Sequence, residues 1–324
     1  MEHNILEIDH LHVVFPSSKG ETSPVNDVSL RVPAGKIVGI VGESGCGKSM
    51  TARAVMGLIH APGRITEGEI RLCGRDLRKL SEKEYCSLRG SEVSMIFQEP
   101  MTSLNPVMKA GHQVEEVLRL HTDIPESELK QRVIDIFRAV GITEPEKRYN
   151  CYPHELSGGL RQRVIIAMAM ICRPRLMIAD EPTTALDVTV QAQILRLMKD
   201  LVSDDTGLLV ISHDLGVIAK LCDYVYVMYA GRIVEESDIF TLFDDPQHPY
   251  TKGLMDAVGS LRRDAEVLST IPGVVPSLAH LPAGCSFCLR CKDSTECCEN
   301  ELPELVRTGP GHKVRCHLMK EAGQ

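Results

Sequence analysis

A phosphate-binding motif lies near the N-terminus, where Gly42 to Ser49 read GESGCGKS and fit the pattern G-x-x-x-x-G-K-S/T. A compact apolar run precedes it and a segment of helical character follows it, which is the context that this motif requires. Glycines permit a tight turn whose backbone N–H groups converge on phosphate oxygens at the positive end of the next helix. Lys48 would bring charge to the β- and γ-phosphates, and the Ser49 hydroxyl would ligate Mg²⁺. The segment predicts a nucleoside triphosphate site.

Two carboxylates, Asp180 and Glu181, follow the apolar residues of the run RLMIAD, which begins at Arg175. Carboxylates at the end of a buried strand are costly unless a cation or a partner lies beside them. A phosphate site also needs a second Mg²⁺ contact and a group that positions water. Taken alone, the pair would fit a solvated strand end. Beside a phosphate loop, we assign Asp180 to the metal and Glu181 to the attacking water.

A serine and two glycines, Ser157 to Gly159, precede the strongly apolar segment LRQRVIIAMAMI. Serine is a favoured N-cap, so capping alone would account for Ser157. It would not account for the glycines, because glycine weakens the first turn of a helix. The segment therefore predicts a second helix start that binds an anion.

Half of the twelve cysteines lie between Cys285 and Cys316. Cys285, Cys288 and Cys291 have the C-x2-C-x2-C spacing of bacterial ferredoxins, but Thr295 stands where the fourth ligand is expected. Four thiolates suit structural zinc or an iron–sulfur centre, whereas a reducing cytosol disfavours disulfides. Because this segment has few aromatic residues and can bury little apolar area, metal–thiolate bonds are expected to hold it together.

Short apolar runs alternate with helical segments up to about residue 255, which predicts an α/β fold. The runs at 36–42, 175–180, 207–212 and 224–229 have the length of strands buried on both faces of a mainly parallel sheet. A helix is expected over 48–59. Residues 1–35 alternate apolar and polar positions, which indicates antiparallel strands, and 105–156 show the spacing of a helical insertion. A richer proline and glycine content after Tyr250 marks a boundary near residue 260.

Composition and the terminal residues argue against several classes of protein. The 324 residues carry a net charge of −8, which argues against a nucleic-acid binder. The N-terminal residues have no basic region ahead of an apolar run, so no signal peptide is expected. No apolar stretch approaches the length that spans a bilayer. We expect a chain that is soluble or held at a membrane by another protein.

These motifs together resemble the ATP-binding subunits of ABC transporters over essentially the whole chain. The resemblance includes Gln98 in MIFQEP, the segment TTALDV at 183–188, and His213 in VISHDL. Leu160 departs from the pattern, because many members of the superfamily have glutamine after LSGG. The resemblance implies a P-loop NTPase core with an antiparallel β subdomain, a helical subdomain and a cysteine-rich C-terminal extension. The ATP-binding domain would span 1–260, with its helical subdomain at about 101–163, and the extension would span 261–324.

In such proteins two domains pack head to tail, so that each ATP lies between the Lys48 loop of one and the Ser157 turn of the other. The resemblance implies that Gln98 lies beside Mg²⁺ and the water, that His213 bonds the γ-phosphate, and that Asp187 helps to couple the two sites. The implied catalytic residues are Glu181, His213 and Gln98. The implied Mg²⁺ ligands are Ser49, Gln98 and Asp180. The residues implied to contact the nucleotide are Phe15, which would stack on adenine, Gly42, Ser44, Gly45, Cys46, Gly47, Lys48, Ser49, Met50, Gln98, Asp180, Ser157, Gly158, Gly159 and Asp187.

The segment HPYTKGLM at 248–255 and the proline-rich stretch after it resemble the C-terminal extension of oligopeptide, dipeptide and nickel transporter ATPases. The resemblance selects Cys285, Cys291, Cys298 and Cys316 as ligands of a 4Fe–4S cluster, with Zn²⁺ as the alternative. It leaves Cys288 and Cys297 as extra or substitute ligands.

The implied function is ATP hydrolysis that drives uptake of dipeptides or oligopeptides, at the cytoplasmic side of the cell inner membrane. The implied partners are a second, homologous ATPase, two transmembrane permease subunits and, indirectly, an extracytoplasmic peptide-binding protein, with no nucleic acid. One alternative is an importer of nickel or another small solute. Others are a non-transport ABC ATPase acting on DNA or ribosomes, and a structural metal-binding module with an inactive nucleotide fold.

Overall fold

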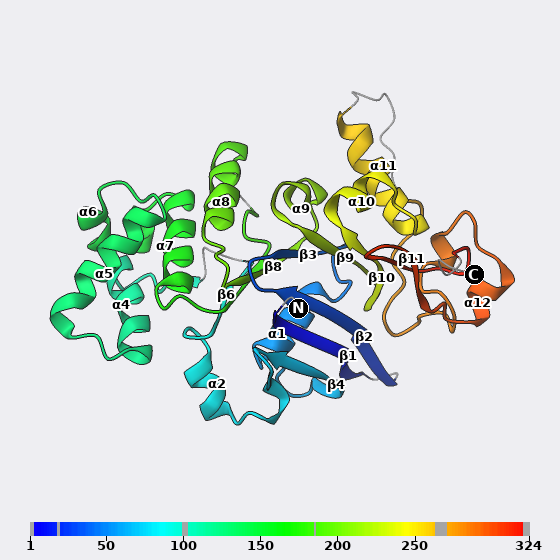
Figure 1. The fold of residues 1–324 in the computed structure, drawn as a ribbon, viewed down its shortest axis with the longest axis horizontal. Helices are drawn as coiled ribbons and strands as arrows, with labels where there is room; N and C mark the ends of the chain where they lie inside the picture. Colours follow the sequence, from blue (N-terminus) through cyan, green and yellow to red (C-terminus); the bar gives the residue numbers. More distant parts are fainter. Residues whose placement is uncertain (1–2, 18–19, 99–102, 185, 263–270, 320–324) are drawn as a thin grey trace. The chain divides into compact units, whose positions relative to one another are not determined.

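The computed structural model describes the chain except residues 1–2, 18–19, 99–102, 185, 263–270 and 320–324 (Figure 1). The side chains of 258–262 also fall outside this description. The chain forms two compact units, each assembled from distant parts of the sequence. The first unit comprises 1–5, 33–36 and 79–210, and the second comprises 6–32, 37–78 and 211–324.

The first unit contains the predicted helical insertion. Its helices are α2 (Glu82–Leu88), α4 (Ala110–His121), α5 (Glu126–Ala139), α6 (Pro145–Tyr149), α7 (Gly158–Met170) and α8 (Val188–Asp200). Figure 1 shows α4 to α7 packed as one group. Helix α5 buries Leu129, Val133 and Phe137, whose spacing of four places them on one face. Helical periodicity was therefore the right guide to this region.

Two parallel strands of the first unit carry candidate site residues. Strand β6 (Val93–Ile96) pairs with β7 (Leu176–Asp180), with Val93 opposite Leu176 and Ile96 opposite Ala179. Every residue of both strands is buried, as expected for a strand covered on both faces. Since the two strands run in the same direction, the residues that follow them emerge at the same edge of the sheet.

The second unit contains a four-stranded sheet in the order β2-β1-β4-β5. Its strands are β1 (Asn4–Ser17), β2 (Gly20–Pro33), β4 (Arg64–Leu72) and β5 (Arg75–Asp76). Strand β1 pairs with β4 in the antiparallel direction, which agrees with the prediction for β1. The sequence did not indicate β4 or β5.

A second group of strands in this unit has the order β11-β12-β10-β9-β3. Strand β3 (Ile37–Val41) is parallel to β9 (Tyr224–Tyr229), and β9 is antiparallel to β10 (Arg232–Asp238). Strand β8 (Gly207–Ser212) has residues in both units. The helices are α1 (Lys48–Val55), α9 (Leu215–Leu221), α10 (Ile239–Asp244), α11 (Pro249–Arg262) and α12 (Glu296–Asn300). Helix α1 ends before the predicted Ile59 because Gly57 adopts a left-handed conformation, φ 64°, which stops a helix.

The C-terminal extension, orange to red in Figure 1, adds a hairpin to strand β10. The hairpin consists of β11 (Leu305–Gly309) and β12 (His312–Arg315), and Val314 lies opposite Glu235. The His312 imidazole contacts the Glu235 carboxylate at 2.7 Å, and both side chains are buried. A backbone ladder and a buried polar pair therefore anchor the extension to β10, a contribution that the sequence did not indicate, while the expected metal–thiolate bonds remain a prediction.

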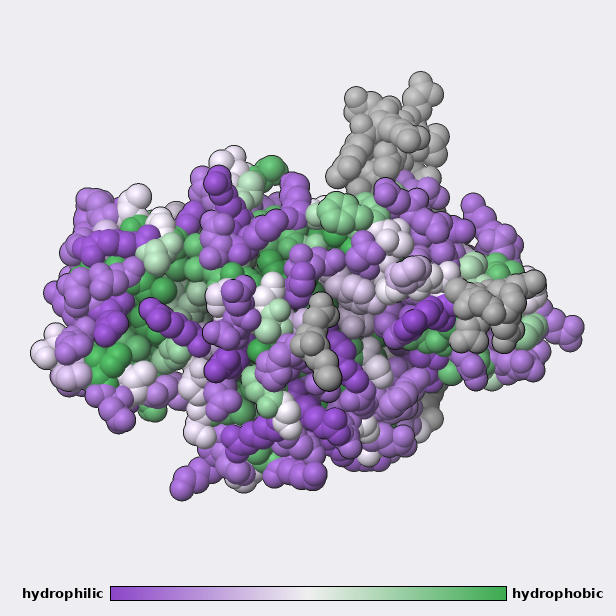
Figure 2. Space-filling model, viewed as in Figure 1, coloured by the Kyte–Doolittle hydropathy of each residue, from purple (hydrophilic) through white to green (hydrophobic). Residues whose placement is uncertain are grey.

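The face of the molecule drawn in Figure 2 is largely hydrophilic, with apolar residues gathered in smaller areas. Within the described part of the chain, no helix combines the length and the apolar character needed to cross a membrane.

Candidate active site

The phosphate loop joins β3 to α1 in the second unit, as the sequence predicted. Its lysine is buried, and the Lys48 ammonium donates to the backbone carbonyls of Gly42, at 2.8 Å, and Glu43, at 3.0 Å. Gly47 has φ 110°, and a Cβ atom there would collide with the Pro24 carbonyl. Only glycine fits this position, since an L side chain would suffer both the strained backbone and the collision.

The remaining loop residues take different positions. Ser44 and Gly45 are exposed at the turn, while Cys46 is buried and its carbonyl accepts a hydrogen bond from the Gly231 N–H at 2.9 Å. Burial raises the pKa of the Cys46 thiol, which keeps it protonated at neutral pH. Ser49 and Met50 lie partly exposed in the first turn of α1. Cys46 therefore acts as a small core residue rather than as a reactive thiol.

The carboxylate pair lies at the end of β7 in the first unit. Asp180 is 3% exposed, and Glu181 has a left-handed backbone, φ 48°. For a residue with a side chain this conformation costs about 1 kcal/mol, and such residues cluster at functional sites. The Glu181 Oε2 atom accepts hydrogen bonds from the Gln98 amide at 2.9 Å and from the Thr184 hydroxyl at 3.0 Å. The structure thus brings together Gln98 and Glu181, two of the predicted catalytic residues.

The serine–glycine turn starts helix α7 in the same unit. The Ser157 hydroxyl caps the helix by accepting from the Leu160 N–H at 3.4 Å, and both Ser157 and Gly158 are exposed. A Cβ atom added to Gly158 would meet only Leu186, at 4.0 Å, whereas one added to Gly159 would lie 2.9 Å from Val190. The chain's own packing therefore requires glycine at 159 and leaves room for a side chain at 158.

Three further candidate residues lie on or next to other helices and strands. Asp187 caps helix α8 by accepting from the Val190 N–H at 2.9 Å. His213 is exposed directly after β8. Phe15 lies partly exposed on β1, where its ring covers Gly63. That these residues and the two groups above meet around one nucleotide remains a prediction from the sequence.

The four cysteines proposed as cluster ligands line one small cavity, together with Cys288. Those four are Cys285, Cys291, Cys298 and Cys316. Cys297 points elsewhere, with its sulfur 3.6 Å from Glu301 and 3.7 Å from His317. Burial raises the pKa of Cys285 to about 11, so its thiol is protonated at neutral pH without a metal. In the regions that the structure describes, no group of three or more histidine, cysteine or acidic side chains is arranged to hold a metal ion.

The phosphate loop contacts the extension, and no local pattern in the sequence indicates this contact. Glu43, the second residue of the loop, is paired with Arg290, and its backbone N–H donates to the Tyr250 hydroxyl at 2.8 Å. These residues are far apart in the chain and match no local pattern, so only the fold reveals them.

Comparison with known proteins places these features in a family. A model described as "ABC transporter" matches residues 25–184, and one described as "Oligopeptide/dipeptide transporter, C-terminal region" matches residues 234–298. The chain is 46% identical to the oligopeptide transport ATP-binding protein AppD of Bacillus subtilis, covering 98% of both chains. It is 45% identical to the dipeptide transport ATP-binding protein DppD of Escherichia coli, covering 99% of this chain and 98% of that protein.

A solved structure is similar as well. It is a dimeric ATP-binding cassette, MJ0796, in a post-hydrolysis state bound to ADP and Pi. The TM-score is 0.65 at 26% sequence identity, over 72% of this chain and 98% of the other. The sequence motifs, the fold and these relatives agree. This chain belongs to the ABC transporter family of ATP-binding subunits, in its oligopeptide/dipeptide branch.

Proposed function

We propose that this chain binds and hydrolyses ATP to power the import of dipeptides or oligopeptides. The observation that carries the proposal is the similarity over nearly the full length to subunits named for oligopeptide and dipeptide transport, with identities of 45% and 46% in the two compared above. The presence of Lys48, Asp180 and Glu181 supports an active nucleotide site over an inactive structural module.

The chemistry follows from the residues at hand. Mg²⁺, held by Ser49, Gln98 and Asp180, would neutralise charge on the phosphates. Because the Gln98 Nε2 atom donates to Glu181, its Oε1 atom is the one that would face the ion. Glu181 would orient the attacking water and accept its proton. The Lys48 ammonium would donate its hydrogen bonds to phosphate oxygens in place of the loop carbonyls. His213 would donate to the γ-phosphate, and Phe15 would stack on the adenine.

A head-to-tail pair of ATPase domains would complete the site. Gly158 is exposed and has space around it in its own chain, so the absence of a side chain there suits the approach of another molecule. The phosphates of an ATP bound to a second, homologous domain would lie against this helix start, where N–H groups and the helix dipole favour an anion. Asp187 would help to couple the two ATP sites of the pair. We propose that the pair is a heterodimer of this chain and a second, homologous ATPase.

The cysteine cavity is proposed to hold a 4Fe–4S cluster through Cys285, Cys291, Cys298 and Cys316. Support comes from the donor set, since all four thiols line the same cavity, as Cys288 also does, while Cys297 does not. When bound, the cluster would cross-link the segments that carry its ligands. Zinc is the alternative.

Transport itself requires a path through the membrane, which we assign to two permease subunits. The chain would act as a peripheral protein on the cytoplasmic side of the inner membrane, and a peptide-binding protein would contribute indirectly. The test is purification of the tagged chain from detergent-solubilised membranes. Two permeases and a second ATPase should accompany it. Ribosomes or DNA in their place would favour the non-transport alternative.

The solute is tested separately in a strain that lacks this chain. Uptake of labelled dipeptide, oligopeptide and nickel would be compared with and without the restored chain, using a Lys48→Ala chain as the matched control. Restored peptide uptake that needs Lys48 is the expected result. Restoration of nickel uptake alone would replace the peptide assignment by the nickel one.

A further inference from the structure

An ion pair joins the cysteine-rich extension to the phosphate loop. Arg290 lies between Cys288 and Cys291, and its guanidinium donates to both carboxylate oxygens of Glu43, at 2.6 and 3.1 Å. The Arg290 side chain is only 4% exposed, and that of Glu43 is 28% exposed. A bidentate contact with one partner buried fixes orientation as well as distance. The extension is thereby tied to the second residue of the loop.

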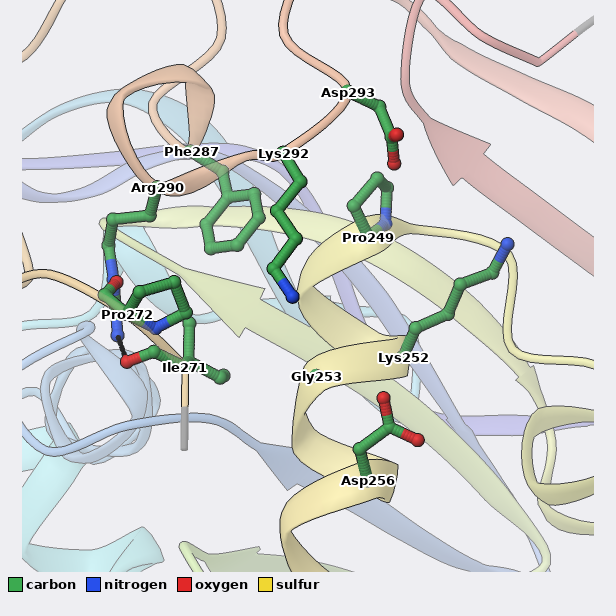
Figure 3. Close-up of a pocket in the computed structure, with 10 residues that line it drawn as sticks. All are labelled: Pro249, Lys252, Gly253, Asp256, Ile271, Pro272, Phe287, Arg290, Lys292 and Asp293. Atoms are coloured by element: carbon green, nitrogen blue, oxygen red, sulfur yellow. Dashed lines mark hydrogen bonds between the residues drawn. The ribbon is translucent and has the colours of Figure 1, made fainter. Parts of the chain in front are cut away.

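The rest of the Arg290 side chain is also held in place. Its Nε atom donates to the Pro272 carbonyl at 2.9 Å, and its Nη2 atom donates to the Ile271 carbonyl at 3.3 Å. Figure 3 shows the Arg290 side chain beside these two residues. The guanidinium carbon is 5.9 Å from the centres of the Tyr229 and Phe287 rings. These contacts leave the arginine little freedom to follow Glu43 if the loop moves.

Glu43 connects this anchor to the lysine of the phosphate site. Its backbone carbonyl accepts from the Lys48 ammonium at 3.0 Å, and its N–H donates to the Tyr250 hydroxyl at 2.8 Å. The Tyr250 ring in turn contacts Tyr229 and Phe287, with ring centres 4.7 and 5.5 Å apart. Phe287 directly precedes Cys288. A continuous set of contacts therefore runs from the cysteine segment to the loop.

Glu43 also places a negative charge on a loop that must receive an anion. A carboxylate beside a triphosphate is unfavourable, since like charges repel strongly where solvent is partly excluded. Arg290 offsets that charge and holds the carboxylate against the extension.

We infer that Arg290 is a positioning residue for ATP binding, and that the cysteine segment therefore influences the affinity of the nucleotide site. The inference rests on the proposed ATP-binding function. Arg290 would not contact the nucleotide itself and would act through Glu43. Because linkage is reciprocal, ATP bound at the loop should also stabilise the cysteine segment.

The first test measures equilibrium binding of a fluorescent ATP analogue to the purified full chain. Arg290→Ala should weaken binding about tenfold, within the usual range for coupling between sites. Glu43→Ala removes the tether and the charge together and should weaken binding less. The double variant Arg290→Ala/Glu43→Ala should recover part of the loss, because no bare carboxylate remains. The matched control is Lys313→Ala, which removes a different ion pair of the extension, with Glu236 at 2.7 Å. This control should bind as the wild type does.

The second test is hydrogen exchange of the backbone at 285–291, measured with and without the analogue. Exchange should slow on binding in the wild type and in Lys313→Ala, and should not respond in Arg290→Ala at a saturating analogue concentration. Equal affinity of wild type and Arg290→Ala would overturn the inference, as would equal losses in Arg290→Ala and the double variant. If Arg290→Ala does not fold, Glu43→Ala alone must still abolish the exchange response. A wild type that binds no analogue would contradict the proposed function itself.

Discussion

Gln98 and Glu181 are joined by a hydrogen bond of 2.9 Å, although 83 positions separate them in the chain. They meet because they follow β6 and β7, which are parallel and adjacent. The Thr184 hydroxyl donates a second hydrogen bond to the same carboxylate, and the Glu181 backbone is left-handed. A carboxylate held by two hydrogen bonds would lose little entropy on orienting a water molecule, which is the role we propose for Glu181.

The exposed glycine of the serine–glycine turn provides a test of the head-to-tail arrangement. Gly158→Ala should fold normally and gain about 0.5–1 kcal/mol of stability, because alanine is the better helix former and the site has space for a methyl group. The same methyl group would obstruct the partner's ATP, so turnover by the assembled pair should fall at least tenfold. Thermal unfolding and steady-state ATPase activity measure the two effects.

Gly159→Ala serves as the contrast for that experiment. Its Cβ atom would lie 2.9 Å from Val190, so both stability and activity should decrease. Unchanged turnover in Gly158→Ala would contradict a role for this turn in a shared site.

The cysteine cavity predicts which thiols matter for metal content. Anaerobically purified chain should contain iron and acid-labile sulfide, and Cys291→Ser should lose most of both, because this thiol lines the cavity. Cys297→Ser is the matched control and should keep them, since its sulfur is turned toward Glu301 and His317. Zinc without sulfide would replace the iron–sulfur assignment, and loss in both variants would refute the choice of ligands.

The buried His248 predicts a loss of stability in acid. Burial lowers the pKa of His248 to about 3, whereas the unfolded chain has the ordinary value near 6.5. The folded state therefore disfavours the proton, and its stability is complete above pH 6.5 and declines as the pH falls toward 3. The decline from this group is about 1.4 kcal/mol per pH unit, or about 2 kcal/mol at pH 5.

The His248 Nδ1 atom accepts a hydrogen bond from the Tyr250 N–H at 3.0 Å. In His248→Asn the side-chain oxygen can accept the same hydrogen bond, but the amide cannot be protonated in this pH range. The variant should lose about 2 kcal/mol less than the wild type between pH 7 and pH 5, in urea unfolding at each pH. Parallel losses in both proteins would show that His248 is not the group responsible.

Sequence reasoning succeeded where local composition determines structure. Strands β3 and β7 are continuous apolar runs, and the phosphate loop carries a motif with a fixed backbone geometry, so both were predictable. Strands β11 and β12 were missed because they are short and largely polar, and they are stabilised by pairing with each other and, for β12, with β10. The contact between Glu43 and Arg290 joins residues 247 positions apart, and nothing in either segment indicates it. The hydrogen bond from Gln98 to Glu181 was also not predictable, because it depends on the pairing of β6 with β7.

The most direct test of the hydrolytic site is Glu181→Gln, studied in the assembled ATPase pair. The amide keeps the shape of the side chain and an oxygen that accepts from Gln98 and Thr184, but it is a very poor base. ATP affinity should stay within about twofold of wild type, while single-turnover hydrolysis should fall by about 10²–10⁴. Hydrolysis at a rate near that of the wild type would contradict the assignment of Glu181 as the residue that activates water.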